Sequence, residues 1–236
     1  MKISHLYLSV CFVSTTSLAY EEVQIENLPA VKENTYSLNA HGVFDDIDMF
    51  SIQADSTISI SESFGGTLGV NNYYINSDYH SENIQNVRAG IFMRSPDIGR
   101  IEFAYQQVFF NDSNEHLYNI TSEYYFENWT LGGFFITDEL TDLRDLNLYS
   151  NIYFNDSIRL EIDLFDTSDN SVVKGTIQFQ LPENIGNEWM FSISYGEDLI
   201  GDNQIGLGVK YIPDFHSTLK KYYRNYSANI KSLFFN

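Results

Sequence analysis

The chain has 236 residues, a formal net charge of −19 and a single cysteine, Cys11. So acidic a chain has no basic surface that could follow a phosphate backbone, and we expect no nucleic-acid partner. A lone cysteine excludes an internal disulfide and a thiolate metal cluster, and we expect no cofactor.

The first nineteen residues have the layout of a secretory signal peptide. Lys2 precedes an apolar stretch from Leu6 to Val13, and the small-residue site Ser17-Leu18-Ala19 follows. We expect residues 1–19 to be removed, which leaves 12 Lys+Arg against 32 Asp+Glu, a charge of −20. Residues 20–34 are then expected to form an N-terminal periplasmic segment.

Beyond the signal, the sequence favours strands over membrane-spanning helices. No run of about eighteen apolar residues follows, so a transmembrane helix is not expected. The chain has 17 Tyr and 18 Phe but only 4 Pro. Tyr and Phe favour pleated, half-apolar surfaces and membrane interfaces, so any membrane crossing is expected to use β-strands.

Strand-length stretches of alternating apolar and polar residues recur along this part of the chain. The clearest is 157–165, where Ile158 and Leu160 fall on one face and Arg159 and Glu161 on the other. A helix cannot separate those two sets. The twelve predicted strands are 35–44, 49–60, 64–75, 84–94, 99–110, 116–126, 129–137, 143–154, 157–165, 171–181, 188–196 and 203–212.

These strands predict an all-β fold, a transmembrane antiparallel up-and-down β-barrel over residues 35–215. About 12 strands are expected, within a range of about 10 to 14, because 35–44 and 129–137 alternate poorly. A sheet that crosses hydrocarbon must close on itself, since every backbone N–H and C=O needs a partner. A soluble sandwich of two sheets would show the same alternation. The signal peptide and the connections between the strands favour the barrel.

The predicted connections alternate in length, as in outer-membrane barrels with short turns at the periplasmic end. The expected short turns are 61–63, 95–97, 127–128 and 155–156, and only 182–187 breaks this pattern. The expected longer loops are 76–83, 111–115, 138–142, 166–170 and 197–203. The pairs Tyr125-Phe126 and Tyr153-Phe154 lie beside short turns, so we expect both to join the periplasmic aromatic girdle.

The polar strand faces are expected to line the lumen and the apolar faces to meet lipid. Charged groups facing an interior need partners or water, which indicates a hydrated channel or an internal salt-bridge network. We expect Arg94 to lie near Glu102, and Arg159, Glu161 and Lys174 to share a ladder of mixed charge. The candidate lumen-lining residues are Arg88, Arg94, Glu102, Glu123, Arg159, Glu161, Asp163, Lys174 and Lys210.

Residues 216–236 form a basic, aromatic C-terminal tail without any acidic residue. Two interpretations stay open. The tail lies against or inside the acidic barrel, or its end at Leu233-Phe234-Phe235 is similar to the C-terminal signal recognised by barrel-assembly machinery. The basic residues of the tail are Lys220, Lys221, Arg224 and Lys231.

The chain resembles the small porins and uncharacterised outer-membrane β-barrel proteins of gammaproteobacteria. The resemblance covers nearly all of the exported chain, through the hairpin period, the aromatic-acidic turns at 125–128 and 153–156, and the tail from Thr218 to Phe235. It implies a passive barrel in the cell outer membrane, in contact with outer-membrane lipid, lipopolysaccharide and barrel-assembly machinery. It implies no catalytic or substrate-binding residues.

Three functions are compatible with this pattern. The first is a porin-like passive channel for small polar solutes, and the second is a non-conducting structural or interaction barrel. The third, a barrel enzyme acting on lipid, needs a histidine on the wall, and only His41 is expected there, with His80 and His116 by loops and His216 in the tail. No nucleophile motif or metal-ligand spacing occurs, so we expect no enzyme activity, catalytic residue or metal site.

Overall fold

The computed structural model describes residues 30–31, 33–44, 47–77, 81–111, 113–138, 144–166, 171–197, 203–213, 215 and 217–226. The predicted signal peptide lies outside these residues and stays a prediction. The strands are β1 (Thr35–Phe44), β2 (Ile47–Ser59), β3 (Phe64–Ser77), β4 (Ser81–Ser95), β5 (Gly99–Phe109), β6 (Asn114–Tyr125), β7 (Trp129–Asp138), β8 (Arg144–Asn155), β9 (Ile158–Asp166), β10 (Ser171–Gln180), β11 (Trp189–Glu197) and β12 (Asn203–Tyr211). A short helix, α1 (Leu219–Lys221), continues as a π-helical turn, η1 (Tyr222–Tyr226).

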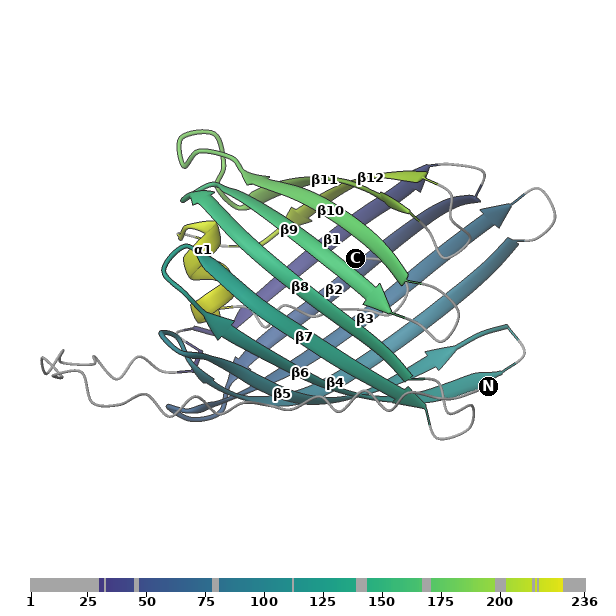
Figure 1. Ribbon diagram of the computed structural model, residues 1–236, viewed down its shortest axis with the longest axis horizontal. Helices are drawn as coiled ribbons and strands as arrows, with labels where there is room; N and C mark the ends of the chain where they lie inside the picture. The colour runs from purple at the N-terminus through teal and green to yellow at the C-terminus, as the bar shows by residue number, and fades with distance from the viewer. Residues whose placement is uncertain are drawn as a thin grey trace, which may run out of the picture.

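The twelve strands form one closed barrel in which each strand pairs with its sequence neighbours (Figure 1). The ring closes where β1 pairs antiparallel with β12, with Leu38 opposite Tyr211 and Phe44 opposite Ile205. This closure leaves no free sheet edge. The predicted fold class and strand number are confirmed.

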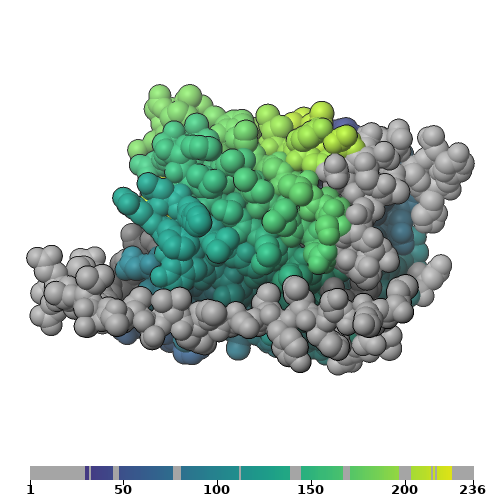
Figure 2. Space-filling model, viewed as in Figure 1, coloured from purple at the N-terminus to yellow at the C-terminus, as the bar shows by residue number. Residues whose placement is uncertain are grey.

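Apolar side chains cover the outside of the barrel on every strand. Examples are Ile52 on β2, which is 54% exposed, and Leu148 on β8, which is 49% exposed. Strands β7 to β9 lie side by side on this outer surface (Figure 2). A soluble sandwich would bury such residues between its sheets, so the outward apolar face excludes that alternative.

None of the helices in the described part of the chain is long and apolar enough to cross a membrane.

The two ends of the barrel differ less than expected. We call the end with 60–63, 96–98, 126–128, 156–157 and 181–188 the turn end, and the opposite end the loop end. Connections span two to eight residues at the turn end and two to five at the loop end. The expected contrast in length is therefore wrong, because the strands continue into the predicted loops, as where β3 reaches Ser77 and β4 begins at Ser81.

The aromatic pairs beside the turns divide between the two faces of the wall. Phe126 and Phe154 point outward and are 42% and 64% exposed, whereas Tyr125 and Tyr153 point inward and are 4% and 5% exposed. Neighbouring residues on a strand point to opposite faces, so only one member of each pair can join an outer girdle. On the outside, Phe126 packs edge-on against Trp129 with ring centroids 4.6 Å apart. The expectation that both members lie in the girdle is wrong.

Candidate functional site

The lumen has a packed side, formed by the inward residues of β4 to β9. Every inward residue from Arg100 to Val108 on β5 is buried, as is every one from Leu117 to Tyr125 on β6 and from Thr130 to Asp138 on β7. Large polar and charged side chains fill this side, including Glu102 and Gln106, each 1% exposed. Charges held this far from water must be compensated within the protein.

A chain of ion pairs compensates four of these charges. Arg88 Nη2 donates to Glu102 Oε1 at 2.8 Å, and Arg100 lies between two carboxylates, 3.4 Å from Glu102 and 3.2 Å from Glu123. Hydroxyl groups add hydrogen bonds to both carboxylates: Thr67 Oγ1 donates to Glu102 at 2.9 Å, and Tyr149 donates to Glu123 at 2.6 Å. Two arginines and two glutamates thus form one connected, neutral network, which we call the central network.

The register of the hairpin from β4 to β5 explains which residues enter the central network. Arg94 is opposite Arg100, and Glu102 is opposite Phe92. Arg94 instead lies near the turn end, where its guanidinium donates to the backbone oxygen of Ala30 at 3.1 Å and lies 4.7 Å from the Phe92 ring centroid. Glu102 forms its ion pairs with Arg88 and Arg100, while Arg94 lies near enough for its charge to act on Glu102 and Glu123. Sequence reasoning omitted Arg100, although it lies on the same strand face as Glu102.

The remaining predicted charges lie on β9, β10 and β12. Arg159 pairs with Glu161 at 3.5 Å, and both are buried. In the sheet register Lys174 is opposite Asp163, which has no exposed surface. Lys210 lies nearer the turn end, opposite Met190. Arg159, Glu161 and Asp163 thus follow one another along the inner face of β9, and Lys174 faces the interior beside Asp163 on β10.

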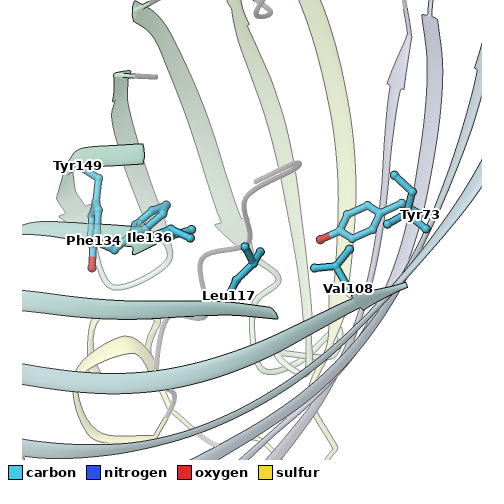
Figure 3. Close-up of a cluster of buried hydrophobic side chains, with 7 residues drawn as sticks. Tyr73, Val108, Leu117, Phe134, Ile136 and Tyr149 are labelled. Carbon is cyan, nitrogen blue, oxygen red and sulfur yellow. The ribbon is translucent and has the colours of Figure 1, made fainter. Parts of the chain in front are cut away.

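An apolar arc interrupts the polar lining toward the loop end. Figure 3 shows its side chains along the inner wall of β3, β5, β6, β7 and β8. Phe134 and Ile136 face inward while Phe135 between them is 38% exposed outside, which explains why β7 alternates poorly in apolar character. The buried members of the arc are Tyr73, Ile84, Val108, Leu117, Phe134, Ile136 and Tyr149.

Two glycines on the packed side make room for the groups of the central network. A Cβ atom at Gly132 would lie 2.3 Å from the Tyr149 ring, which crosses this glycine to reach Glu123. A Cβ atom at Gly90 would lie 2.8 Å from Glu102 Oε1. Close packing of this kind leaves little space for water between β4 and β9.

The opposite wall, formed by β10 to β12, β1, β2 and part of β3, is the open side of the lumen. Thr67 and Tyr73 of β3 are buried against the packed side. The inward positions of the open side include small residues such as Ser192, Ser194, Gly206 and Gly208, and the His41 ring lies against both glycines. Polar side chains along this wall are partly exposed. The partly exposed, inward polar residues are Asn39, His41, Asp55, Asn71, Lys174, Thr176, Ser192, Gln204 and Lys210.

Segments from both ends of the chain cover the turn end. Ala30 and Val31 are buried against Phe92, and a Cβ atom at Gly65 would lie 2.7 Å from Val31. On the other side, the chain after β12 turns back into the barrel mouth, where α1 lies in Figure 1. Its buried residues form a cluster with Tyr153 and Met190 of the wall; they are Ile212, Phe215, Leu219, Tyr222 and Tyr223.

Among the described residues, no three His, Cys, Asp or Glu side chains converge in a way that could hold a metal ion.

No protein-family model matches the chain, and no curated protein matches it. Solved structures do match in fold. A KdgM porin in complex with disordered oligogalacturonate has a TM-score of 0.62 at 11% identity, with 76% of this chain and 99% of that chain covered. A NanC porin has a TM-score of 0.55 at 10% identity, covering 74% and 98%. Outer membrane phospholipase A from Escherichia coli has a TM-score of 0.51 at 10% identity, covering 76% and 95%. In fold, the chain is a small porin-like β-barrel, as the sequence resemblance implied.

Proposed function

We propose that this protein is a porin-like passive channel for small polar solutes in the cell outer membrane. The observation that carries the proposal is the open side of the lumen. Partly exposed polar residues run along it from Lys174 and Gln204 near the loop end, through His41 and Ser192, to Lys210 near the turn end. A continuous polar wall inside an apolar shell is what solute passage through a membrane requires.

The outward apolar face supports placement in a membrane, and the even number of strands brings both ends of the barrel to the turn end. We assign the turn end to the periplasm and the loop end to the cell exterior, since an exported chain inserts from the periplasmic side. Outer-membrane lipid and lipopolysaccharide then contact the apolar outer face, and barrel-assembly machinery inserts the chain. The porins of similar fold support a channel. The oligogalacturonate in complex with one of them is a ligand of that protein.

Bilayer reconstitution tests the proposal. Folded protein is first identified by the change in its gel mobility on heating. It is then inserted into planar bilayers in KCl. We expect stepwise conductance, and we expect swelling of loaded liposomes in small sugars. Refolded barrels that insert and never conduct, either intact or with the C-terminal tail removed, contradict the channel.

The second candidate is a non-conducting structural or interaction barrel, and the packed side is the observation that favours it. The ion pairs and the apolar arc occupy the lumen from β3 to β9, and the terminal segments cover the turn end. This candidate predicts the same folded barrel with no solute flux. The bilayer measurement therefore separates the two.

We infer no enzymatic role. The similarity to a phospholipase barrel is one of fold alone, at 10% identity. His41 faces the lumen as expected, with Ser51 opposite it on β2, and His116 shares a hydrogen bond of 2.5 Å with the Tyr105 hydroxyl. A phospholipid hydrolysis assay on the folded protein should detect no release of fatty acid. Release that disappears in His41→Ala would reverse this inference.

A further inference from the structure

Residues 217–226 lie in the barrel mouth without belonging to its wall. The segment turns back after β12 and forms α1 and η1 at the turn end, with the Thr218 side chain accepting from Lys221 N as the helix cap. Leu219 has no exposed surface, and Tyr222 and Tyr223 are 1% and 5% exposed. The Tyr222 and Tyr223 side chains therefore point into the barrel, whereas Lys221 on the same helix is exposed.

The two tyrosines lie at the turn end of the open side. The Arg159 guanidinium lies 3.8 Å from the Tyr223 ring centroid, and the Tyr223 hydroxyl donates to Gln178 Oε1 at 2.7 Å. Lys210 Nζ lies 5.8 Å from the centroids of both Tyr222 and Tyr223. Arg159, Gln178 and Lys210 come from β9, β10 and β12, so the segment covers the end of the strands where the open side reaches the mouth.

Further contacts fasten the segment to the rim, among them a hydrogen bond of 2.9 Å from Gln180 Nε2 to the backbone oxygen of Ser217. Arg224 donates to the backbone oxygens of Phe126 and, at 2.8 Å, of Trp129. Lys220 Nζ donates to Asn128 Oδ1 at 3.3 Å, and Leu219 N donates to the backbone oxygen of Asp156 at 2.9 Å. These contacts are side-chain bonds and isolated backbone bonds at turns. They lie outside the hydrogen-bond ladders of the sheet, so the segment can leave while the barrel stays closed.

We propose that residues 217–226 are a displaceable plug that closes the periplasmic end of the open side. This inference rests on the proposed channel function, because a plug has a role only if a path for solutes reaches the barrel mouth. Tyr222 and Tyr223 occupy the mouth, and Arg159 and Lys210 lie over the ring faces, where the quadrupole is negative. When the plug leaves, Arg159, Gln178 and Lys210 become part of the exposed channel wall.

The first test weakens the plug in the full-length chain. Tyr223→Ala removes the cation–π contacts with Arg159 and Lys210 and one hydrogen bond, and the ratio of open to closed channels in planar bilayers is expected to rise roughly tenfold. The matched control, Lys221→Ala, changes an exposed residue of the same helix and should leave the ratio unchanged. Ending the chain after Phe215 should give a channel that stays open.

The second test holds the plug in place. In a Cys11→Ser background, Lys220→Cys and Asn128→Cys are joined by a reducible bismaleimide linker, at positions whose native side chains are 3.3 Å apart. Conductance is expected to fall below that of the unlinked protein and to return on reduction.

The outcomes separate the plug from the channel. If the wild-type protein conducts and neither Tyr223→Ala nor the linker changes its conductance, the plug is wrong and the channel stands. If no variant conducts, including the shortened chain, although all show the gel mobility of folded barrels, the channel and the plug are both wrong. Tyr223→Ala keeps the test decisive if the shortened chain fails to fold.

Discussion

The two sides of the lumen have the same β-strand backbone but differ in how tightly their inward side chains are packed. On the packed side, arginines and glutamates are paired, tyrosines cross glycines, and inward residues of β5, β6 and β7 are buried. On the open side, His41 and the serines of β11 pack against the glycines of β12, and Lys174, Lys210 and Asp55 stay partly exposed. Because the barrel closes around both, one half can supply stability while the other half supplies the path. The strands of the packed side thus stabilise the barrel, and those of the open side line the proposed path.

The largest expected difference between the two sides comes from placing a tryptophan on each. Ser192→Trp, on the open side, is expected to remove most of the conductance while the barrel still folds, because the indole fills the path. Ala104→Trp, on the packed side, should prevent folding, since overpacking a filled interior is destabilising. Conductance in bilayers and heat-dependent gel mobility measure the two effects. Normal conductance in folded Ser192→Trp would place the path elsewhere.

The next largest difference is expected in the free energy of unfolding when one charge is removed on each side. Glu102→Gln leaves the buried Arg88 and Arg100 short of a counter-charge, and we expect the free energy of unfolding to fall by roughly 3 kcal/mol or more. Asp55→Asn, on the partly exposed wall, is the matched control and should cost less than about 1 kcal/mol. Urea unfolding in lipid vesicles, followed by tryptophan fluorescence, gives both values. Equal costs would mean that the central network adds no stability.

The glycine beneath Tyr149 provides a smaller test of packing. Gly132→Ala places a methyl group where the ring now crosses, so Tyr149 must move away from Glu123, at a cost of about 1–3 kcal/mol. Gly175→Ala is the control, because the nearest atom to its added Cβ would be 3.9 Å away. The same unfolding measurement applies. A neutral Gly132→Ala would show that the Tyr149–Glu123 hydrogen bond is dispensable.

The smallest expected effect concerns ion selectivity. Lys174→Gln removes a positive charge from the open side, and the anion-to-cation permeability ratio should fall roughly twofold to threefold at low salt. Arg88→Gln, on the packed side, should leave that ratio unchanged in whatever fraction folds. Reversal potentials across a KCl gradient measure the ratio. If Arg88→Gln changed the permeability ratio more than Lys174→Gln, the ion path would run along the packed side.

Several features follow from the sequence by local rules. Alternation along 157–165 determines that Arg159, Glu161 and Asp163 share one face, because side chains on a strand alternate strictly. Counting such segments gives twelve strands, and the turns between them make neighbours antiparallel. The same rule would have placed Arg100 beside Glu102 on the inner face. The signal peptide and the role of the tail beyond residue 226 remain predictions from sequence.

Only the tertiary structure decided which interior residues meet. The register around the 96–98 turn sets Arg94 opposite Arg100, and a shift of this kind is invisible to a pattern that repeats every two residues. Ring closure then brings β12 beside β1, so that glycines 206 and 208 face His41 although more than 160 residues separate them in sequence. The division into packed and open sides, and the return of residues 217–226 into the mouth, depend on such long-range contacts. Alternation defines the two faces of each strand, and closure of the ring determines what each inner face contacts.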